Sequence, residues 1–467
     1  MSVATDRIAS QIKRFTKITP SNSSGDGIFS FQKGNNVIRF SVAEQDAFLL
    51  APETRLQFKL NCRTSDTVGI AFDGTTNIDA KIGAQAIIQT LTISSRRYAT
   101  SICEQIHNYN QLVSVAHPAL SSTRDLTTQR NHEQLCVGQG ILEADQINDN
   151  AQAVFTSRID MKDLQRKYIV SPAAKTAQLG MDCSLQLYAG MFMSDNIDLR
   201  LFGGLEIEIT LAPDSNVFNN ATATSYYEIS DVILNAPILY KSSQQMMSGA
   251  QPASVSFLTW SSLYNVAQST NATITNKVGL RGALSMVQKF VPIAYLNNWG
   301  QQLDGSSGAN AFASWNPGVK RLTFHRNGQR FPNEYQIATN RGDGLPIENL
   351  PNSKGCQVLI NSLSAFQNYK DVKHTHLTSQ NLSDLTENNF FLGVSFDQIS
   401  GQGIDLSGGT ISTELESALF DPAKAPLGGG ITDRNAQYSQ KPFGVFTFFL
   451  NKNTLVIQPN QRIQSIE

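Results

Sequence analysis

Alternating apolar and polar residues run through several short segments of the chain. In "LEIEITL", residues 205–211, apolar side chains occupy every second position, and Glu206, Glu208 and Thr210 lie between them. Residues 38–42 and 56–60 repeat the same period of two. This alternation is typical of β-strands in a sheet that has one face in a core and the other in water or against a partner.

Similar short strands, separated by long polar loops, are predicted along the rest of the chain. They lie around Leu185, Leu322, Val358, Leu392 and Phe446. Many short strands with few helices predict an all-β protein built from jelly-roll sandwiches. At 467 residues the chain suits two such domains of about 200–250 residues each. Phe-Gly precedes an apolar run at residues 202–203 and again at 443–444, which adds the hypothesis that one fold occurs twice.

Two segments show the spacing of an amphipathic helix instead. Residues 101–116 place apolar side chains at i, i+4, i+7, i+11 and i+14, with Ser101 and Glu104 as a capping box and Pro118 after the end. Residues 279–292 carry four apolar side chains at the same spacing and end at Pro292. We therefore predict one short helix inserted in a loop of each half.

The composition excludes some classes of protein. Hydrophobic residues make up 40% of the chain, enough for sizeable cores, and charged residues only 16%, below the usual ~25%. The formal net charge is −1, and no block of like charge occurs. We therefore expect neither a sequence-specific nucleic-acid binder nor a protein that binds anionic membranes through a basic patch.

The cysteines and the N-terminus indicate a chain made inside a cell and not secreted. The cysteines are odd in number and none forms a C-x-x-C pair: Cys62, Cys103, Cys136, Cys183 and Cys356. This pattern predicts reduced thiols, not a disulfide framework or a zinc site. The first residues lack the apolar core of a signal peptide, and the longest apolar run, "FGVFTFFL", is too short to span a bilayer.

Three segments resemble parts of the double jelly-roll major capsid proteins of polinton-like viruses and virophages, in the PRD1–adenovirus structural lineage. They are "QTLTISSRRYATSICEQIHNYNQLVSVA", "YYEISDVILNAPILY" and "VKRLTFHRNGQRFPNEYQI". With the terminal "FGVFTFFLNKNTLVIQPN" they cover roughly residues 85 to 460. The second segment resembles the strand that closes the first jelly roll in that family.

The resemblance implies a fold and a function. Each half would form an eight-stranded antiparallel jelly roll, over residues 28–248 and 249–467, with Lys241–Ser254 as the linker and a short C-terminal tail. Homotrimers would form pseudo-hexameric capsomers in the icosahedral shell of a double-stranded DNA virus. The partners would be the chain itself, neighbouring capsomers, and penton and minor capsid proteins, and the location would be the virion.

Residues 1–27 are polar and rich in turn-forming residues, and we predict an N-terminal arm outside the sandwich core. Ile8, Ile12 and Phe15 lie at i, i+4 and i+7 and are the predicted assembly residues. One interpretation is a frayed terminus. The other is an arm that docks on a neighbouring capsomer, a minor capsid protein or an inner membrane. In either case, deleting residues 1–24 is expected to leave the melting temperature nearly unchanged.

The search for catalytic, cofactor and metal motifs predicts no enzyme, no cofactor and no metal. There is no G-x-S-x-G or P-loop motif. We interpret Gly401–Leu406 as a surface turn, and His374 with His376 as an incomplete metal site. Arg341-Gly342-Asp343 matches the integrin-binding tripeptide, but three residues in a loop are ordinary turn chemistry. N-x-[ST] sequons begin at Asn22, Asn220, Asn271 and Asn381 and matter only in a secreted protein.

Two other classes of function stay open on the sequence. A carbohydrate-binding β-sandwich would need clustered exposed aromatic residues, and Trp260, Trp299 and Trp315 do fall within one stretch. A hydrolase built on a β-sandwich would need two convergent carboxylates. The capsid protein is the interpretation that we favour.

Overall fold

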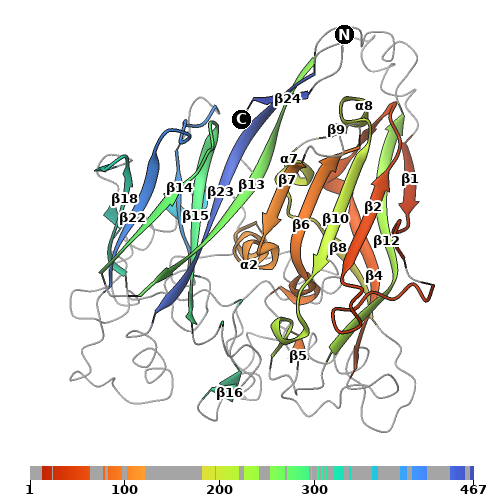
Figure 1. Ribbon diagram of the computed structural model, residues 1–467, viewed down its shortest axis with the longest axis horizontal. Coiled ribbons are helices and arrows are strands. Elements are labelled where there is room, and N and C mark those ends of the chain that lie inside the picture. Colours follow the sequence, from red (N-terminus) through yellow and green to blue (C-terminus); the bar gives the residue numbers. More distant parts are fainter. Residues whose placement is uncertain are drawn as a thin grey trace.

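A computed structural model gives the fold of the protein (Figure 1). Within the described residues the chain forms antiparallel sheets with few and short helices, as the sequence predicted. The structure describes residues 13–23, 25–63, 77–78, 82–96, 102–120, 181–194, 196–219, 226–240, 253–268, 271–293, 296, 302–303, 307–308, 312, 319–330, 336–337, 360–366, 390–396, 402–417, 442–457 and 463–466.

The first half of the chain forms two main sheets. One has the order β8-β4-β12-β3-β9, with β1 paired to the other side of β12, and the second has the order β2-β10-β6-β7. The strands of the first sheet are β1 (Lys13–Ile18), β3 (Ala47–Leu49), β4 (Arg55–Arg63), β8 (Met181–Gln186), β9 (Ile197–Asp198) and β12 (Tyr226–Tyr240). Those of the second are β2 (Val37–Val42), β6 (Ile88–Ser95), β7 (Ile102–His107) and β10 (Leu205–Leu211).

Smaller elements connect these strands. A two-stranded ribbon joins β5 (Asn77–Ile78) to β11 (Phe218–Asn219). The helices are η1 (Ala51–Glu53), η2 (Gly83–Ile87), α2 (Tyr109–Leu120), α7 (Gly190–Ser194), α8 (Leu199–Phe202) and η4 (Asp214–Asn216).

The second half also forms two main sheets. Their orders are β13-β23-β15-β21, with β24 on β23, and β14-β22-β18-β19, with β20 on β18. The strands of the first sheet are β13 (Ala253–Ala267), β15 (Ala283–Pro292), β21 (Leu392–Ser395), β23 (Phe443–Ile457) and β24 (Ile463–Ile466). Those of the second are β14 (Asn271–Lys277), β18 (Val319–Arg326), β19 (Gln329–Arg330), β20 (Gln336–Ile337) and β22 (Thr410–Ser417). A short hairpin joins β16 (Gln302–Leu303) to β17 (Ser307–Gly308).

The two halves share one strand order. In the first sheet of each, β1-β12-β4-β8 corresponds to β13-β23-β15-β21. In the second, β2-β10-β6-β7 corresponds to β14-β22-β18 followed by β19 and β20. The last long strand of each half pairs with the first strand of that half, which is the closure expected of a jelly roll. The fold therefore occurs twice, side by side (Figure 1).

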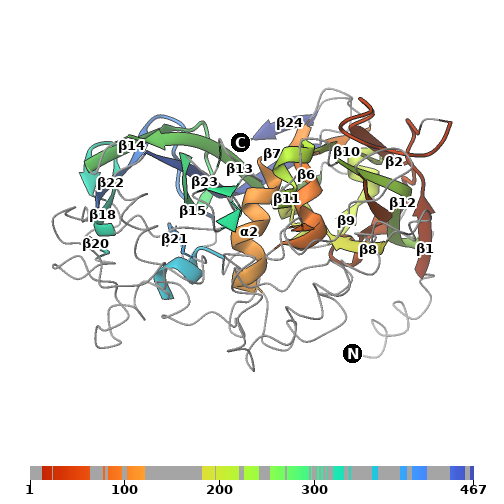
Figure 2. The ribbon, with the colours of Figure 1, turned by 90° about the horizontal axis from the view of Figure 1, so that it is seen from below.

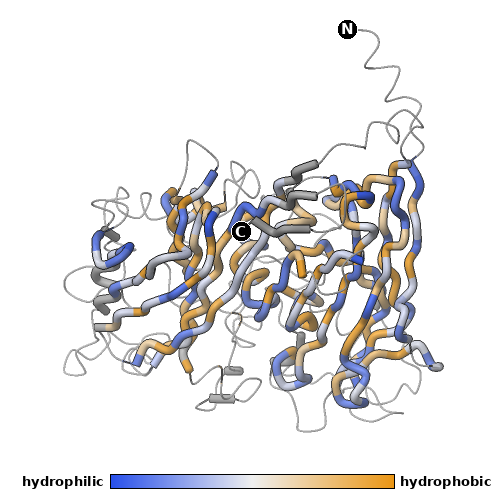
Figure 3. Tube along the Cα trace, turned by 45° about the horizontal axis from the view of Figure 1, so that its top comes forward, coloured by the Kyte–Doolittle hydropathy of each residue, from blue (hydrophilic) through white to orange (hydrophobic). Residues whose placement is uncertain are grey.

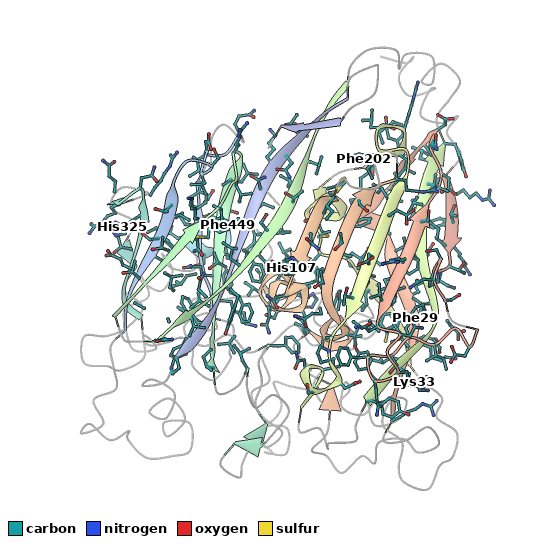
Figure 4. The ribbon with its side chains drawn as sticks, viewed as in Figure 1. Phe29, Lys33, His107, Phe202, His325 and Phe449 are labelled. Atoms are coloured by element: carbon teal, nitrogen blue, oxygen red, sulfur yellow. The ribbon has the colours of Figure 1, made fainter. Side chains whose placement is uncertain are left out.

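The core lies between the two sheets of each half. Along β10 the side chains alternate between buried and half-buried, as the period of two predicted. Figure 3 shows the same alternation of hydrophobic and hydrophilic positions along many strands. Side chains fill the space between the sheets, among them Phe449 in the second half (Figure 4).

The helix predicted over residues 101–116 is wrong in its first part. Residues Ile102–His107 form β7, which pairs with β6, and the helix α2 begins only at Tyr109. Asn108 separates the two elements with a φ of 53°, in the left-handed region that ends a strand. Ile102 is exposed and Glu104 is buried, so the apparent helical spacing of apolar residues was coincidental. Pro118 lies inside the helix and does not follow it.

The helix predicted over residues 279–292 is also wrong. Ala283–Pro292 forms β15, which pairs with β23 and β21. Residues 283–291 are all buried, so both faces of this strand are covered. A strand covered on both faces loses the alternation that identifies strands in a sequence.

The arm predicted over residues 1–27 needs correction as well. Lys13–Ile18 pairs antiparallel with β12, from Lys13 opposite Leu239 to Ile18 opposite Leu234. This segment is the first strand of the first jelly roll and therefore part of its sheet.

The predicted correspondence between the two Phe-Gly pairs is also wrong, because Gly203 caps α8 before β10, whereas Phe443 and Gly444 open β23. Those two strands occupy different places in the shared order.

Candidate assembly surfaces and the junction between the halves

The two halves meet where β7 of the first lies beside β13 of the second (Figures 1 and 2). Each of these strands is at the end of its own sheet. Glu104 on β7 is only 3% exposed. Its Oε1 accepts the backbone N–H of Trp260 on β13 at 2.7 Å. A buried carboxylate thus bonds one half to the other; we call this region the junction.

The same carboxylate also binds the short helix α7. Oε1 accepts the backbone N–H of Gly190 at 2.8 Å, and Oε2 accepts that of Met191 at 3.0 Å. Hydrogen bonds to an ionised carboxylate are stronger than those between neutral groups. Glu104 therefore links its own strand, β7, to α7 and β13. Without this carboxylate, three backbone N–H groups would lose their hydrogen-bond acceptor.

Burial controls the acid–base behaviour of the groups around the junction. It raises the pKa of Glu104 from its ordinary 4.5 to about 7, and the three N–H donors offset part of that rise. It also raises the pKa of Tyr109, at the start of α2, and brings the pKa of the Cys103 thiol to about 12. Cys103 is thus a neutral thiol at physiological pH and not an activated nucleophile.

A second buried charge crosses the junction from the other side. Lys289 on β15 is 0% exposed. Its Nζ donates to Gln111 Oε1 at 2.6 Å and to Ser114 Oγ at 2.6 Å, both on α2 of the first half. It also donates to the backbone oxygen of Phe312 at 2.9 Å. An ammonium group needs several such acceptors when it is removed from water.

Close backbone packing completes the junction. A Cβ atom at Gly190 would lie 2.6 Å from the carbonyl carbon and oxygen of Leu258 on β13, so only glycine lets α7 approach this strand. Phe202, labelled in Figure 4, packs edge-on against Phe257 of β13 with ring centroids 6.0 Å apart. The halves are therefore fastened by a carboxylate, an ammonium group and apolar contacts.

The sequence reasoning missed both charged residues of the junction. Glu104 was assigned to a capping box, and Lys289 lay inside a segment interpreted as a helix. The usable signal was a charged residue in an otherwise apolar run, as in "SMVQKFVP". Charged side chains are rarely buried unless they have partners, so such a residue marks either a solvent-facing position or a polar contact between elements.

The structure places one of the three predicted assembly residues. Phe15 lies on β1, opposite Pro237 of β12, and its side chain is 61% exposed. Lys13 Nζ lies 5.1 Å from the centroid of its ring. Ile8 and Ile12 lie outside the described residues, so their role stays a prediction.

Most of the other sequence candidates also lie outside the described residues. They are His374, His376, Arg341-Gly342-Asp343, Trp299, Trp315, Asn220, Asn381, Cys136 and Cys356. In the described part of the Gly401–Leu406 segment, Ile404 forms an antiparallel bridge with Ala283 and Leu406 is buried, so this part packs against β15 and is not the surface turn that we predicted. Trp260 is buried in the junction and is not an exposed sugar-binding ring.

The described residues show neither a metal-binding cluster nor a helix that could span a membrane. Among them, no group of three or more His, Cys, Asp or Glu side chains is arranged to hold a metal ion. Within the same parts of the chain, no helix is long and apolar enough to cross a bilayer.

No family model and no curated protein matches the chain. Solved structures do match it. A chain of the Sputnik virophage solved by cryo-EM has a TM-score of 0.54 at 10% identity, over 97% of this chain and 88% of that one. The Faustovirus major capsid protein has a TM-score of 0.53 at 9% identity, over 96% and 91%. The quasi-atomic capsid structure of the PBCV-1 virus gives 0.52 at 9% identity, over 98% and 97%.

The fold is the double jelly roll. The alignments run through almost the entire length of both chains, so both halves and their succession are shared with the viral proteins. At such low identity the likeness establishes the fold. In this double jelly roll the junction residues Glu104 and Lys289 fasten the two sandwiches to each other.

Proposed function

We propose that the chain is the major capsid protein of a double-stranded DNA virus. The observation that carries the proposal is the tandem repeat of one strand order among the described strands, together with alignments to the PBCV-1 capsid structure and the Faustovirus major capsid protein over 98% and 96% of this chain. This role needs no catalytic residue, so we propose that the protein is not an enzyme.

The capsomer that we propose is a homotrimer. Each chain contributes two similar jelly rolls, so three copies present six similar units around one axis. Such a particle packs among six neighbours with approximate sixfold symmetry, and repeated self-complementary surfaces close into finite assemblies. The buried charged groups at the junction support this idea, because they hold the two units of one chain in a fixed relation.

The remaining partners and the location follow from this role. We propose that the trimer contacts neighbouring capsomers and penton and minor capsid proteins, that it is made inside the host cell, and that it resides in the virion. The jelly rolls would divide between β12 and β13, close to the proposed boundary at residue 248. Residues before β1, including Ile8 and Ile12, would contact an inner membrane or a neighbouring protein.

Native mass spectrometry of the purified chain, combined with negative-stain imaging, tests the proposal. We expect a dominant trimer at micromolar concentration, and particles with approximate sixfold outline. A dominant monomer would contradict the capsid role. A monomer that also bound specific sugars on a glycan array would support the carbohydrate-binding alternative.

A further inference from the structure

Each jelly roll has one sheet edge formed by the first strand of its second sheet. In the first half this strand is β2, and in the second half it is β14. The two strands occupy the same place in the shared strand order, so their outer edges can be compared directly. The two edges differ in what covers them.

The outer edge of β2 is covered by the chain that leads into it. The backbone N–H of Ser21 donates to the carbonyl oxygen of Arg39 at 2.7 Å. The side-chain amide of Asn22 donates to the carbonyl oxygen of Val37 at 2.8 Å and accepts the backbone N–H of Arg39 at 2.9 Å. Residues 19–36 connect β1 to β2, which leaves enough chain for this return along the edge.

The corresponding edge of β14 has no such cover within the described parts of the chain. There β14 pairs with β22 alone, and no other described backbone group bonds to its backbone. Only residues 268–270 connect β13 to β14, too few to fold back along a strand of seven residues. One side of β14 therefore presents open backbone donors and acceptors, the feature to which an added strand binds.

Positive charge gathers at one end of this open edge. Lys277, the last residue of β14, and Arg281 are both exposed and form no ion pair with a described residue. The turn after β18 lies beside them, because Thr410, opposite Lys277 on β22, donates its backbone N–H to Asn327 Oδ1 at 2.9 Å. This turn brings Arg326, the last residue of β18, to the same end.

One carboxylate among the described residues, that of Asp405, lies near these cations. Hydrogen bonds from Ser407, and then the charges of Arg281 and Arg326, lower the pKa of Asp405. A single carboxylate does not balance these two guanidinium groups and the ammonium group of Lys277. Positive charge therefore predominates at this end of the edge.

The other end of the edge has the opposite character. On β22, Glu414 lies opposite Thr273 and Glu416 lies opposite Asn271, the first residue of β14. Carboxylates at this end disfavour a further acidic residue beside them. A strand added to β14 would therefore place its acidic residues at the Lys277 end.

We propose that an extended acidic segment of another protein adds to the open edge of β14, with its carboxylates beside Lys277 and Arg281. Backbone pairing would supply most of the affinity, and the cations would select an acidic segment. In the first half Ser21 and Asn22 already occupy the corresponding place, so that half does not accept the segment. An edge lysine can instead prevent pairing with any strand, and in that case no peptide would bind.

Peptide binding to the full-length chain tests the inference. The probe is a fluorescein-labelled synthetic peptide, Thr-Val-Thr-Val-Thr-Glu-Thr-Glu, which combines high β-propensity with acidic residues at one end. Fluorescence anisotropy would give its dissociation constant, and hydrogen exchange read by mass spectrometry would locate the protected amides. We expect binding, together with slower exchange in residues 271–277.

Matched variants and peptides separate strand addition from general charge attraction. Lys277→Gln combined with Arg281→Gln should raise the dissociation constant at least about fivefold, since both favourable charge contacts are lost. Arg39→Gln combined with Lys59→Gln removes two charges from strands of the first half and should change it by less than about twofold. A peptide with proline at its third and fifth positions keeps the charge, loses backbone donors and should not bind.

Several results would overturn the inference. They are no binding up to about 1 mM peptide, protection outside β14, equal affinity of the two double variants, and equal affinity for the proline peptide. If the Lys277→Gln and Arg281→Gln double variant fails to fold, Arg281→Gln alone, outside any strand, replaces it and is judged by the same dissociation constant. The trimer measurement is independent of all these results, so the capsid role is tested separately.

Discussion

Glu104 Oε1 and the backbone nitrogen of Trp260 lie 2.7 Å apart, on strands that belong to different jelly rolls. The same oxygen accepts the N–H of Gly190 at 2.8 Å. One buried carboxylate therefore contributes directly to the contact between two separately closed sandwiches.

Replacing Glu104 by alanine should destabilise the protein strongly. The change leaves three buried N–H groups without their acceptor, and each costs about 1–3 kcal/mol. We expect a loss of at least about 3 kcal/mol in the free energy of unfolding at pH 8, measured by urea denaturation. The control is Glu53→Ala, which removes an exposed ion pair with Lys13 and should cost less than about 1 kcal/mol. Equal losses in the two variants would contradict the role of Glu104.

The raised pKa of Glu104 predicts a pH dependence of stability. The folded state holds the proton up to about pH 7, whereas an unfolded carboxyl loses it near its ordinary 4.5. The folded state thus binds more protons between these values, so its stability falls as the pH rises through this window. Urea denaturation of wild type and Glu104→Gln at pH 4.5, 6 and 8 would check this. The wild type should lose stability relative to the variant from pH 4.5 to 7, and parallel curves would refute the prediction.

Gly190→Ala should loosen the junction without changing any polar group. The added Cβ would lie 2.6 Å from the Leu258 backbone, and strand β13 cannot rotate away as a side chain could. Overpacking of this kind costs about 1–3 kcal/mol, visible as a lower melting temperature in calorimetry. The matched control is Gly279→Ala, where nothing lies within 4 Å of the new atom. A melting temperature equal to that of the control would show that the contact can relax.

Truncating Lys289 should lower the free energy of unfolding more than replacing it by an apolar residue of similar shape. Lys289→Ala leaves a cavity and unpaired acceptors, and we expect a loss of about 2–5 kcal/mol. Lys289→Met keeps most of the volume and removes the cost of burying a charge, so its loss should be smaller. A double-mutant cycle with Ser114→Ala, measured by urea denaturation, would give the coupling across the 2.6 Å contact. A coupling near zero would mean that this contact does not hold the halves together.

The structure changes the expected outcome of N-terminal deletion. Removing residues 1–12 should leave the melting temperature unchanged, because β1 begins at Lys13. Removing residues 1–24 takes away β1 and opens the edge of β12, so the melting temperature should fall by at least about 4 °C. Calorimetry of both truncations distinguishes these cases. Shell assembly that persists without residues 1–12 would show that Ile8 and Ile12 have no docking role.

The fold class could be predicted from the sequence because strands with one buried face, such as β10, alternate apolar and polar residues. The prediction failed where tertiary contacts replace that pattern. Strand β15 is buried on both faces, so its sequence does not alternate. On β7, Glu104 is buried because its carboxylate accepts backbone N–H groups, among them that of Trp260 on β13. Segment Lys13–Ile18 was assigned to an arm because its pairing partner, β12, lies more than 200 residues further along the chain.

The junction itself could not be predicted from the sequence. The burial of Glu104 depends on Trp260, and that of Lys289 on Gln111 and Ser114, all in the other half of the chain. A local pattern carries no information on such contacts. Of the three predicted assembly residues only Phe15 lies among the described residues, and it was chosen for a helical spacing that its strand does not have.

The position of β23 in the middle of its sheet sets the order of folding during synthesis. The first jelly roll has all its main strands once β12 has been made, and it can close while the rest of the chain is still being translated. The second cannot, because β13 and β15 both wait for β23, at residues 443–457 of 467. For most of the translation of the second half, both strands therefore have open edges. A ribosome that stalls before residue 443 would release a chain with one finished sandwich and one aggregation-prone half, so translation speed between β13 and β23 bears directly on the yield of folded protein.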